Sequence, residues 1–316
     1  MPSIDFLHRH REFSDLLRIL GERLSIDPAL VEKDYWIMHC LYGLQRLGLT
    51  FELKGGTSLS KGHGAIHRFS EDIDIRIDPP SSMGVKIGRN QDKPAHRASR
   101  HRFYDWLAET IKIDGIDQVE RDTTFDDVPK FRNGGIRLYY KSATAPLPGL
   151  KEGILLEVGF DDITPNEPKD ISSWAYDFAI GKVSVTDNRA KGVACYHPGY
   201  TLVEKLQTIS TKFRMQQTAG SHPVNFMRHY YDIYCLLQEP AVLSFIGTPA
   251  YRAHKEKRFP PADNKIIAQN EAFFLSEART RSEYEKAYRA SRAIYYKDQP
   301  PFGDILERIQ MYAHQL

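Results

Sequence analysis

Two aspartates separated by one residue give the clearest chemical signal in the chain, within the stretch "EDIDIRID". Asp72 and Asp74 lie on a predicted strand, where alternate side chains leave the same face, so their carboxylates repel unless a cation lies between them. Carboxylate oxygens suit Mg²⁺, or Mn²⁺ in its place, together with substrate phosphates. Ile73 and Ile75 are then expected to point to the opposite, buried face. A solvent-facing edge strand with two acids is the alternative interpretation.

A paired glycine precedes these aspartates, in "KGGTSLSK". Gly55 and Gly56 end a predicted strand, and without a Cβ they let backbone N–H groups approach a ligand closely. Thr57 and Ser58 then open a short predicted helix, whose first amides and hydroxyls suit phosphate oxygens. On its own, such a glycine pair is more typical of a plain strand–turn–helix junction.

The order of these features carries more information than either feature alone. A strand, a glycine turn with Thr-Ser, a short helix and then Asp-x-Asp on the next strand resembles the DNA polymerase β-like nucleotidyltransferase core. In that superfamily a third carboxylate comes from a later, adjacent strand. Glu157 is the only acid inside the apolar strand pattern "GILLEVGF", so we expect it to be the third metal ligand. The alternative for Glu157 is a place on a solvated face.

Four motifs in the same order resemble the AbiEii/AbiGii (MenT-like) nucleotidyltransferase toxins of prokaryotic toxin–antitoxin systems. The first is "KGGTSLSK" followed by "RFSEDIDI". "VEKDYWIMHCLYGL" resembles the family's N-terminal Glu-Lys-Asp-aromatic helix, "YTLVEKLQTI" its Glu-Lys-Leu helix, and "RHYYDIYCLL" its later Arg/Asp-Tyr-Asp helix. The resemblance covers roughly residues 30–238.

This resemblance implies roles for individual residues. Asp72 and Asp74 would hold the catalytic metal, Lys205 would contact the triphosphate of a bound NTP, and Asp232 would complete the active centre. Asp232 could instead orient Lys205 or Arg228. The resemblance also implies an RNA acceptor, the 3′ end of tRNA, whose extension blocks translation, and a cognate antitoxin as partner.

Two residues just before the aspartates have weaker assignments. Arg68 is a candidate phosphate or RNA contact, with a surface salt bridge as the alternative. Ser70 is predicted to share the face of the aspartates, and phosphorylation there would add negative charge beside the metal site. A serine that simply starts the strand is the stronger interpretation of Ser70.

Two basic segments could bind an RNA backbone, since phosphate contacts supply affinity without sequence choice. Residues 81–102 are predicted to form a mobile loop that carries Lys86, Arg89, Lys93, Arg97, Arg100 and Arg102. A second cluster interleaves basic residues with tyrosines: Arg279, Arg281, Lys286, Arg289 and Arg292 with Tyr284, Tyr288, Tyr295 and Tyr296. Solvated surface is the alternative for both.

The rest of the pattern predicts an α/β (α+β) protein: a polymerase β-like core with a mixed sheet, followed by a C-terminal helical bundle. We expect residues 1–195 to form the nucleotidyltransferase domain and 196–316 a helical domain that completes the active site. Asp27 is the expected N-cap of an early helix that begins at Pro28. Strands are predicted at 50–53, 73–78, 136–142, 153–160 and 181–187, and helices at 4–24, 102–113, 200–214, 223–237, 241–255, 263–277, 282–296 and 302–314.

Composition limits the class of protein and its possible partners. The 316 residues are 41% hydrophobic and 27% charged, with a net charge of +2 that does not by itself require a nucleic-acid partner. Three scattered cysteines and the lack of a signal-peptide or membrane-span pattern predict a cytoplasmic protein with no membrane partner.

Three other functions remain open from the sequence alone. A glycosyltransferase could use Asp-x-Asp to hold a nucleotide-sugar diphosphate, but it would not explain the glycine turn. A non-catalytic module for RNA or protein would not need Asp72, Asp74, Lys205 and Asp232 together. An enzyme of the same fold could instead modify a protein or a small molecule.

Overall fold

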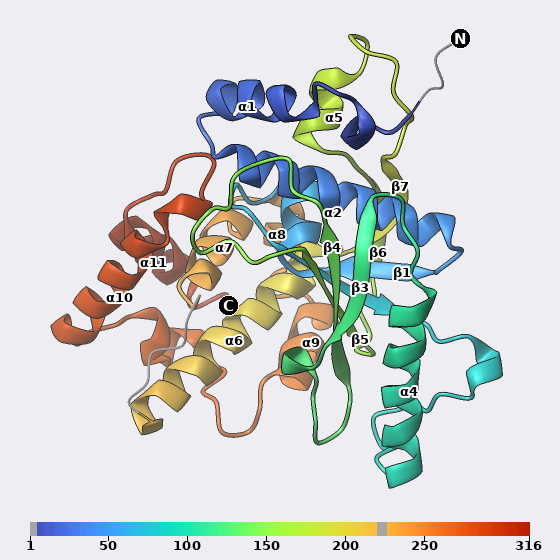
Figure 1. Cartoon of the computed structure of the whole chain (residues 1–316). Helices are drawn as coiled ribbons and strands as arrows, with labels where there is room; N and C mark the ends of the chain where they lie inside the picture. Colours follow the sequence, from blue (N-terminus) through green and yellow to red (C-terminus); the bar gives the residue numbers. More distant parts are fainter. Residues whose placement is uncertain (1–4, 220–225) are drawn as a thin grey trace. The chain divides into compact units, whose positions relative to one another are not determined.

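A seven-stranded mixed sheet carries the Asp-x-Asp strand near its centre, in the order β3-β4-β5-β2-β1-β7-β6 (Figure 1). β2 pairs in parallel with β5 and antiparallel with β1, while β1 pairs in parallel with β7. The strands are β1 Phe51–Lys54, β2 Asp72–Ile77, β3 Ile116–Asp122, β4 Asn133–Tyr140, β5 Ile154–Gly159, β6 Asn166–Ile171 and β7 Ala190–Tyr196. The predicted α/β fold with a mixed sheet is confirmed.

The structure is a computed structural model that describes residues 5–219 and 226–316. The chain divides into two units, one of residues up to 63 together with 69–196, and one of residues 64–68 together with 197–316. The first unit contains the whole sheet. The short segment 64–68 leaves the first unit between the glycine turn and the Asp-x-Asp strand.

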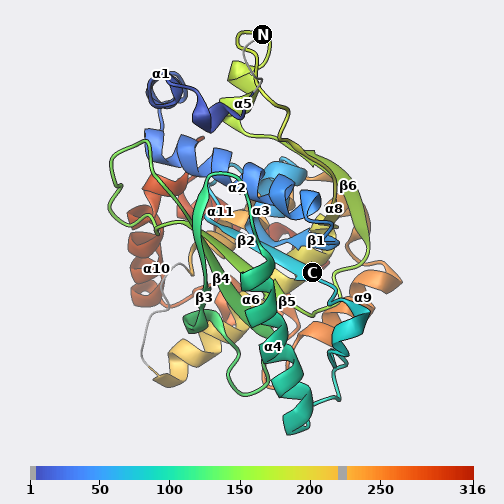
Figure 2. The ribbon, with the colours of Figure 1, turned by 45° about the vertical axis from the view of Figure 1, so that its right-hand side comes forward.

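Five α-helices belong to the described part of the first unit: α1 Phe13–Leu24, α2 Pro28–Arg46, α3 Gly55–Thr57, α4 Pro94–Thr110 and α5 Trp174–Ala179. The predicted cap of α2 is confirmed, because the Asp27 carboxylate accepts a hydrogen bond from the Ala29 N–H at 2.8 Å. Trp36 of α2 stacks on Tyr140 of β4, with ring centroids 4.7 Å apart. α4 packs against β3 and β4 (Figure 2).

Six helices belong to the described part of the second unit: α6 Pro198–Ala219, α7 Arg228–Leu236, α8 Pro240–Phe245, α9 Pro249–Arg258, α10 Ala278–Ala290 and α11 Phe302–Tyr312. The single helix predicted at 241–255 is wrong, because α8 ends before Gly247, whose φ of +79° interrupts the helix. The helix predicted at 263–277 is also wrong, since only two short 3₁₀ turns occur there. The predicted start of the 223–237 helix lies outside the described residues.

One predicted strand is absent, and three observed strands were not predicted. The strand predicted at 181–187 is wrong, since only Val185 forms an isolated bridge, to Asp5. β3, β6 and β7 were not predicted. β3 and β6 are the two edge strands of the sheet and carry many polar residues, so they lack the apolar alternation that marks a half-buried strand.

Candidate active site

Three carboxylates from two neighbouring parallel strands meet on one face of the sheet. Asp74 of β2 is the register partner of Glu157 of β5, and Asp72 is the partner of Leu155. Because side chains alternate along a strand, Asp72, Asp74 and Glu157 all leave the same face. Ile73 and Ile75 point to the other face and are fully buried. The parallel pairing of β2 with β5 therefore brings together the three acids that were predicted separately from the sequence.

Burial and mutual repulsion act on these acids. The pKa of Glu157 rises to about 7 because the carboxyl is buried and because the negative charges of Asp74 and Asp72 lie close to it. Asp72 is 9% exposed, and its Oδ1 has no hydrogen-bond partner among the described residues. A divalent cation bound here would relieve both the repulsion and the unsatisfied oxygen, so the residues present fit a metal ion.

The described residues contain no preformed cage of three or more His, Cys, Asp or Glu side chains already arranged around a metal position. Mg²⁺ commonly takes one or two carboxylates together with substrate phosphates and water. Asp72, Asp74 and Glu157 are the residues that could hold such an ion here.

The glycine turn is shaped by the second aspartate. Gly55 has a φ of +72°, a backbone conformation that glycine adopts readily. A Cβ added at Gly55 would collide with Oδ2 of Asp74. Gly55 therefore has two reasons to be glycine, and one of them is the space occupied by a candidate metal ligand.

Thr57 and Ser58 lie inside the fold. The helix begins at Gly55, two residues earlier than predicted, and continues as a π-helical turn over Ser58–Gly62. Thr57 is 1% exposed, and its hydroxyl donates to the carbonyl oxygen of Asp72 at 2.6 Å. Ser58 is fully buried. The Thr57 hydroxyl thus holds the start of β2, and the backbone amides of Gly55 and Gly56 are left as the groups of this turn that suit a phosphate.

Two lysines beside the acids were not predicted from the sequence. Lys54 is the register partner of Asp74 across β1 and β2, and Lys151 places its ammonium nitrogen 3.5 Å from Oδ2 of Asp72. The charges of Lys151 and Lys54 both act to lower the pKa of Glu157, against the larger effects of burial and the two aspartates. Lys54 could have been noticed because it directly precedes the glycine pair. Lys151 follows the loop "SATAPLPGL" and has no motif around it.

In the second unit, Lys205 and Asp232 form a buried ion pair together with Arg68. Lys205 Nζ lies 2.6 Å from Asp232 Oδ2, and Arg68 donates to both oxygens of Asp232, at 2.6 and 2.7 Å. All three side chains are buried, so Arg68 is not the surface salt bridge considered from the sequence. Burial alone would raise the pKa of Asp232, but the charges of Arg68 and Lys205 outweigh it and hold that pKa well below its usual range.

The first basic segment is more ordered than predicted, and part of it is committed to internal contacts. Helix α4 starts at Pro94 rather than near residue 102, so the expectation of a loop through 81–102 is wrong. Arg100 is fully buried and donates to the carbonyl oxygens of Lys86, Gln91 and Lys130.

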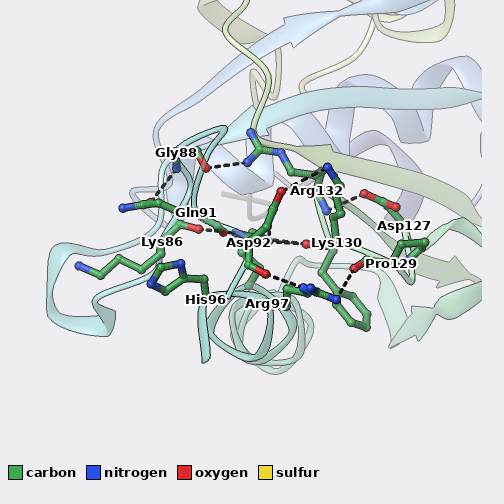
Figure 3. Close-up of polar contacts among 12 residues, drawn as sticks. Lys86, Gly88, Gln91, Asp92, His96, Arg97, Asp127, Pro129, Lys130 and Arg132 are labelled. Atoms are coloured by element: carbon green, nitrogen blue, oxygen red, sulfur yellow. Dashed lines mark hydrogen bonds and ion pairs between the residues drawn. The ribbon is translucent and has the colours of Figure 1, made fainter. Parts of the chain in front are cut away.

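Arg97 likewise donates to the carbonyl oxygens of Asp92 and Pro129, and Figure 3 shows these contacts beside α4. The start of α4 was mispredicted because its first turns bury polar side chains, Ser99 and Arg100, and so lack an apolar periodicity. The exposed cations of the segment are Lys86, Arg89, Lys93 and Arg102.

Most tyrosines of the second basic cluster are buried and do not lie beside its basic residues on the surface. Tyr284 and Tyr288 are each 1% exposed and Tyr295 is 8% exposed, so all three belong to the core of the second unit. Two of the basic residues form i,i+4 ion pairs, Arg279 with Glu283 and Arg289 with Glu285. The expected alternation of accessible bases and tyrosines is therefore wrong, because helical spacing turns the tyrosines inward.

A mixed sheet that carries Asp-x-Asp beside a glycine turn, with a third acid in register on the next strand, defines a nucleotidyltransferase. Residues 39–308 match the model of a family described as "Nucleotidyl transferase AbiEii toxin, Type IV TA system". The chain belongs to this family of toxin nucleotidyltransferases, as the motifs implied. Membership implies a nucleotide substrate and a cognate antitoxin.

The fold is also similar to that of MenT4, a nucleotidyltransferase toxin from Mycobacterium tuberculosis H37Rv. The two chains are 15% identical with a TM-score of 0.53, over 95% of this chain and 88% of that one. No curated protein matches the sequence. In the parts of the chain that the structure describes, every helix is too short or too polar to cross a membrane.

Proposed function

We propose that this toxin transfers a nucleoside monophosphate from an NTP to an RNA acceptor, the 3′ end of tRNA, and thereby blocks translation. The observation that carries the proposal is the set of Asp72, Asp74 and Glu157 on one face of the sheet, with a raised pKa at Glu157. Crowded acids of this kind serve a reaction in which a divalent cation neutralises phosphate charge.

In the proposed reaction, an RNA hydroxyl oxygen forms a bond to the α-phosphorus and releases its proton to solvent, while the bond to the bridging oxygen breaks and pyrophosphate leaves. Asp72, Asp74 and Glu157 would hold Mg²⁺ or Mn²⁺, which supplies electrostatic stabilisation and activates the hydroxyl when bound. The backbone amides of Gly55 and Gly56 would bind phosphate oxygens.

Lys205 is a proposed triphosphate contact, with Arg68 as a second candidate. Asp232 pairs with both cations. A lysine ammonium acts on phosphate as a point charge and stabilises the pyrophosphate as it leaves. Lys205→Met is expected to raise KM for the NTP and to lower kcat, and an unchanged kcat/KM would contradict this role.

The test of the main proposal is incubation of the full chain with Mg²⁺, each radiolabelled NTP in turn and total tRNA. We expect label at the 3′ end of tRNA with one preferred NTP, no label with Asp72→Asn or Asp74→Asn, and loss of label on metal chelation. Label in protein or in a small molecule instead of RNA would contradict the proposed acceptor. Absence of label from every acceptor would contradict the reaction itself.

Toxicity and its control give a second line of test. Expression of the wild type in a bacterial host is expected to stop growth, whereas Asp72→Ala is expected to be harmless. Ser70 is half-buried and lies two residues before Asp72. We propose that the antitoxin system phosphorylates Ser70, which would add negative charge beside the metal site. Mass spectrometry after co-expression with the cognate antitoxin tests it, and neutralisation of Ser70→Ala as well as wild type would contradict it.

A further inference from the structure

Lys151 combines a loosely held ammonium with a tightly held backbone, immediately beside the acids of the sheet. Its Nζ lies 3.5 Å from Oδ2 of Asp72, farther than the roughly 2.7–2.9 Å of a strong charge-assisted hydrogen bond. The Lys151 side chain is 39% exposed. The remaining oxygen of Asp72, Oδ1, has no partner among the described residues, so Lys151 does not satisfy this carboxylate. The ammonium is therefore positioned at the acids but free to serve another anion.

The backbone of Lys151, by contrast, is fixed from both sides. Its N–H donates to Oε2 of Glu71 at 3.1 Å, and its carbonyl oxygen accepts from Lys33 Nζ at 2.5 Å. Lys33 Nζ also lies 3.3 Å from the same Glu71 oxygen. The carbonyl of the next residue, Glu152, accepts from Arg137 at 2.9 Å. Three side chains thus hold the two loop residues that lead into β5.

The arrangement ties Lys151 to the catalytic strand. Glu71 directly precedes Asp72, the first residue of β2. One side chain holds the Lys151 backbone and the other faces the Lys151 ammonium. Lys33 comes from α2 and is only 1% exposed. Burial of a lysine is costly, and an uncharged donor could hold the loop instead. The use of buried Lys33 therefore indicates that the position of Lys151 must be accurate.

We propose that Lys151 is a nucleotide-phosphate contact contributed by the sheet unit, and that Lys33 and Glu71 are positioning residues that hold it at the Asp72 carboxylate. The chemical class of the ligand is a polyphosphate, because an exposed ammonium beside metal-binding acids suits phosphate oxygens that approach together with a divalent cation. This inference rests on the nucleotidyl transfer proposed above, but not on RNA as the acceptor.

Equilibrium binding by isothermal titration calorimetry tests the contact without turnover. The probes are inorganic pyrophosphate and the α,β-methylene analogues of the four NTPs, each with Mg²⁺ and the full chain. Lys151→Gln is expected to weaken the tightest analogue and pyrophosphate by about tenfold to a hundredfold, the scale of one charge-assisted hydrogen bond.

The matched control is Lys191→Gln, which removes another exposed lysine paired with an aspartate, Asp187, in the same unit. It is expected to change these affinities by less than about twofold.

Affinities of Lys151→Gln within about twofold of wild type would overturn the proposal, as would wild-type protein that binds none of these probes. Tight binding by the wild type without label in RNA would contradict only the proposed acceptor, and the affinity ratio of Lys151→Gln to wild type would still decide the role of Lys151.

A double-mutant cycle tests the positioning residues. Lys33→Met alone is expected to raise KM for the NTP more than it lowers kcat, and Lys33→Met combined with Lys151→Gln should be no worse than Lys151→Gln alone. Lys33→Arg should recover part of the loss. Additive losses in the double variant would show that Lys33 acts independently of Lys151 and would overturn its positioning role.

Discussion

Asp74 of β2 and Glu157 of β5 are directly opposite each other in a parallel strand pair, and their proximity contributes to the pKa of about 7 at Glu157. An acid whose pKa is raised in the folded state stores unfavourable energy when it is ionised. The sheet therefore keeps these carboxylates together at a cost that a bound cation would remove. This relationship gives the first prediction.

Glu157→Gln is expected to stabilise the metal-free protein at high pH and to leave it unchanged near pH 4.5. Between the ordinary pKa of 4.5 and the folded value of about 7, the folded protein retains a proton that the unfolded chain has released, so wild-type stability falls as pH rises. Above that window the glutamine variant should be more stable by up to about 3 kcal/mol. Urea unfolding in EDTA across this pH range measures the difference.

The control for this pH effect is Glu167→Gln, on the edge strand β6, where the glutamate pairs with Lys169 at 2.8 Å. Its free energy of unfolding should differ from that of wild type by less than about 0.5 kcal/mol at every pH. A pH-independent difference for Glu157→Gln would show that its charge is not in conflict with the two aspartates.

Gly55→Ala is expected to abolish most transfer activity, because the new Cβ would push Asp74 from its position. A displacement of about 1 Å at a catalytic group can cost roughly a hundredfold in rate. Gly48→Ala is the matched control: Gly48 also has a φ of +72°, but a Cβ there meets nothing within 4 Å. Both variants should lose about 1 kcal/mol of stability from backbone strain, and only Gly55→Ala should lose activity. Equal activities in the transfer assay would contradict the assigned contact.

Asp232→Asn is expected to destabilise the second unit strongly, since Arg68 and Lys205 would remain buried without a counter-charge. Loss of one partner from a buried ion pair typically costs about 3–5 kcal/mol. Asp187→Asn offers a comparison, because Asp187 also pairs with two cations, Arg189 and Lys191, but at the surface. Its loss should cost less than about 1 kcal/mol in a denaturant titration. Similar costs for the two variants would argue against a buried network.

Arg100→Met is expected to destabilise the first unit by about 3 kcal/mol, because three backbone carbonyls would lose their donor. Arg89→Met, in the same segment but exposed, should change stability by less than about 0.5 kcal/mol. Thermal and urea unfolding measure both. If Arg100→Met were neutral for stability but weakened RNA binding, Arg100 would be an RNA contact rather than a structural anchor.

The sequence by itself determined the local parts of this protein. Alternation placed Asp72 and Asp74 on one face of a strand, and the glycine pair marked the turn before them, because both patterns depend only on the backbone repeat and on the missing Cβ. The Asp27 cap was predictable for the same reason. Family motifs added Lys205 and Asp232, whose ion pair is present in the structure.

Only the tertiary structure decided which distant residues meet. The register of β2 against β5 brought Glu157 beside Asp74, and no local pattern states which strands pair. Arg100, a candidate RNA contact from the sequence, is buried and donates to the carbonyl oxygen of Lys86. Lys33 is also buried and donates to the carbonyl oxygen of Lys151. These outcomes depend on contacts between segments far apart in the chain, where the cost of an unpaired buried charge fixes the partner of each residue.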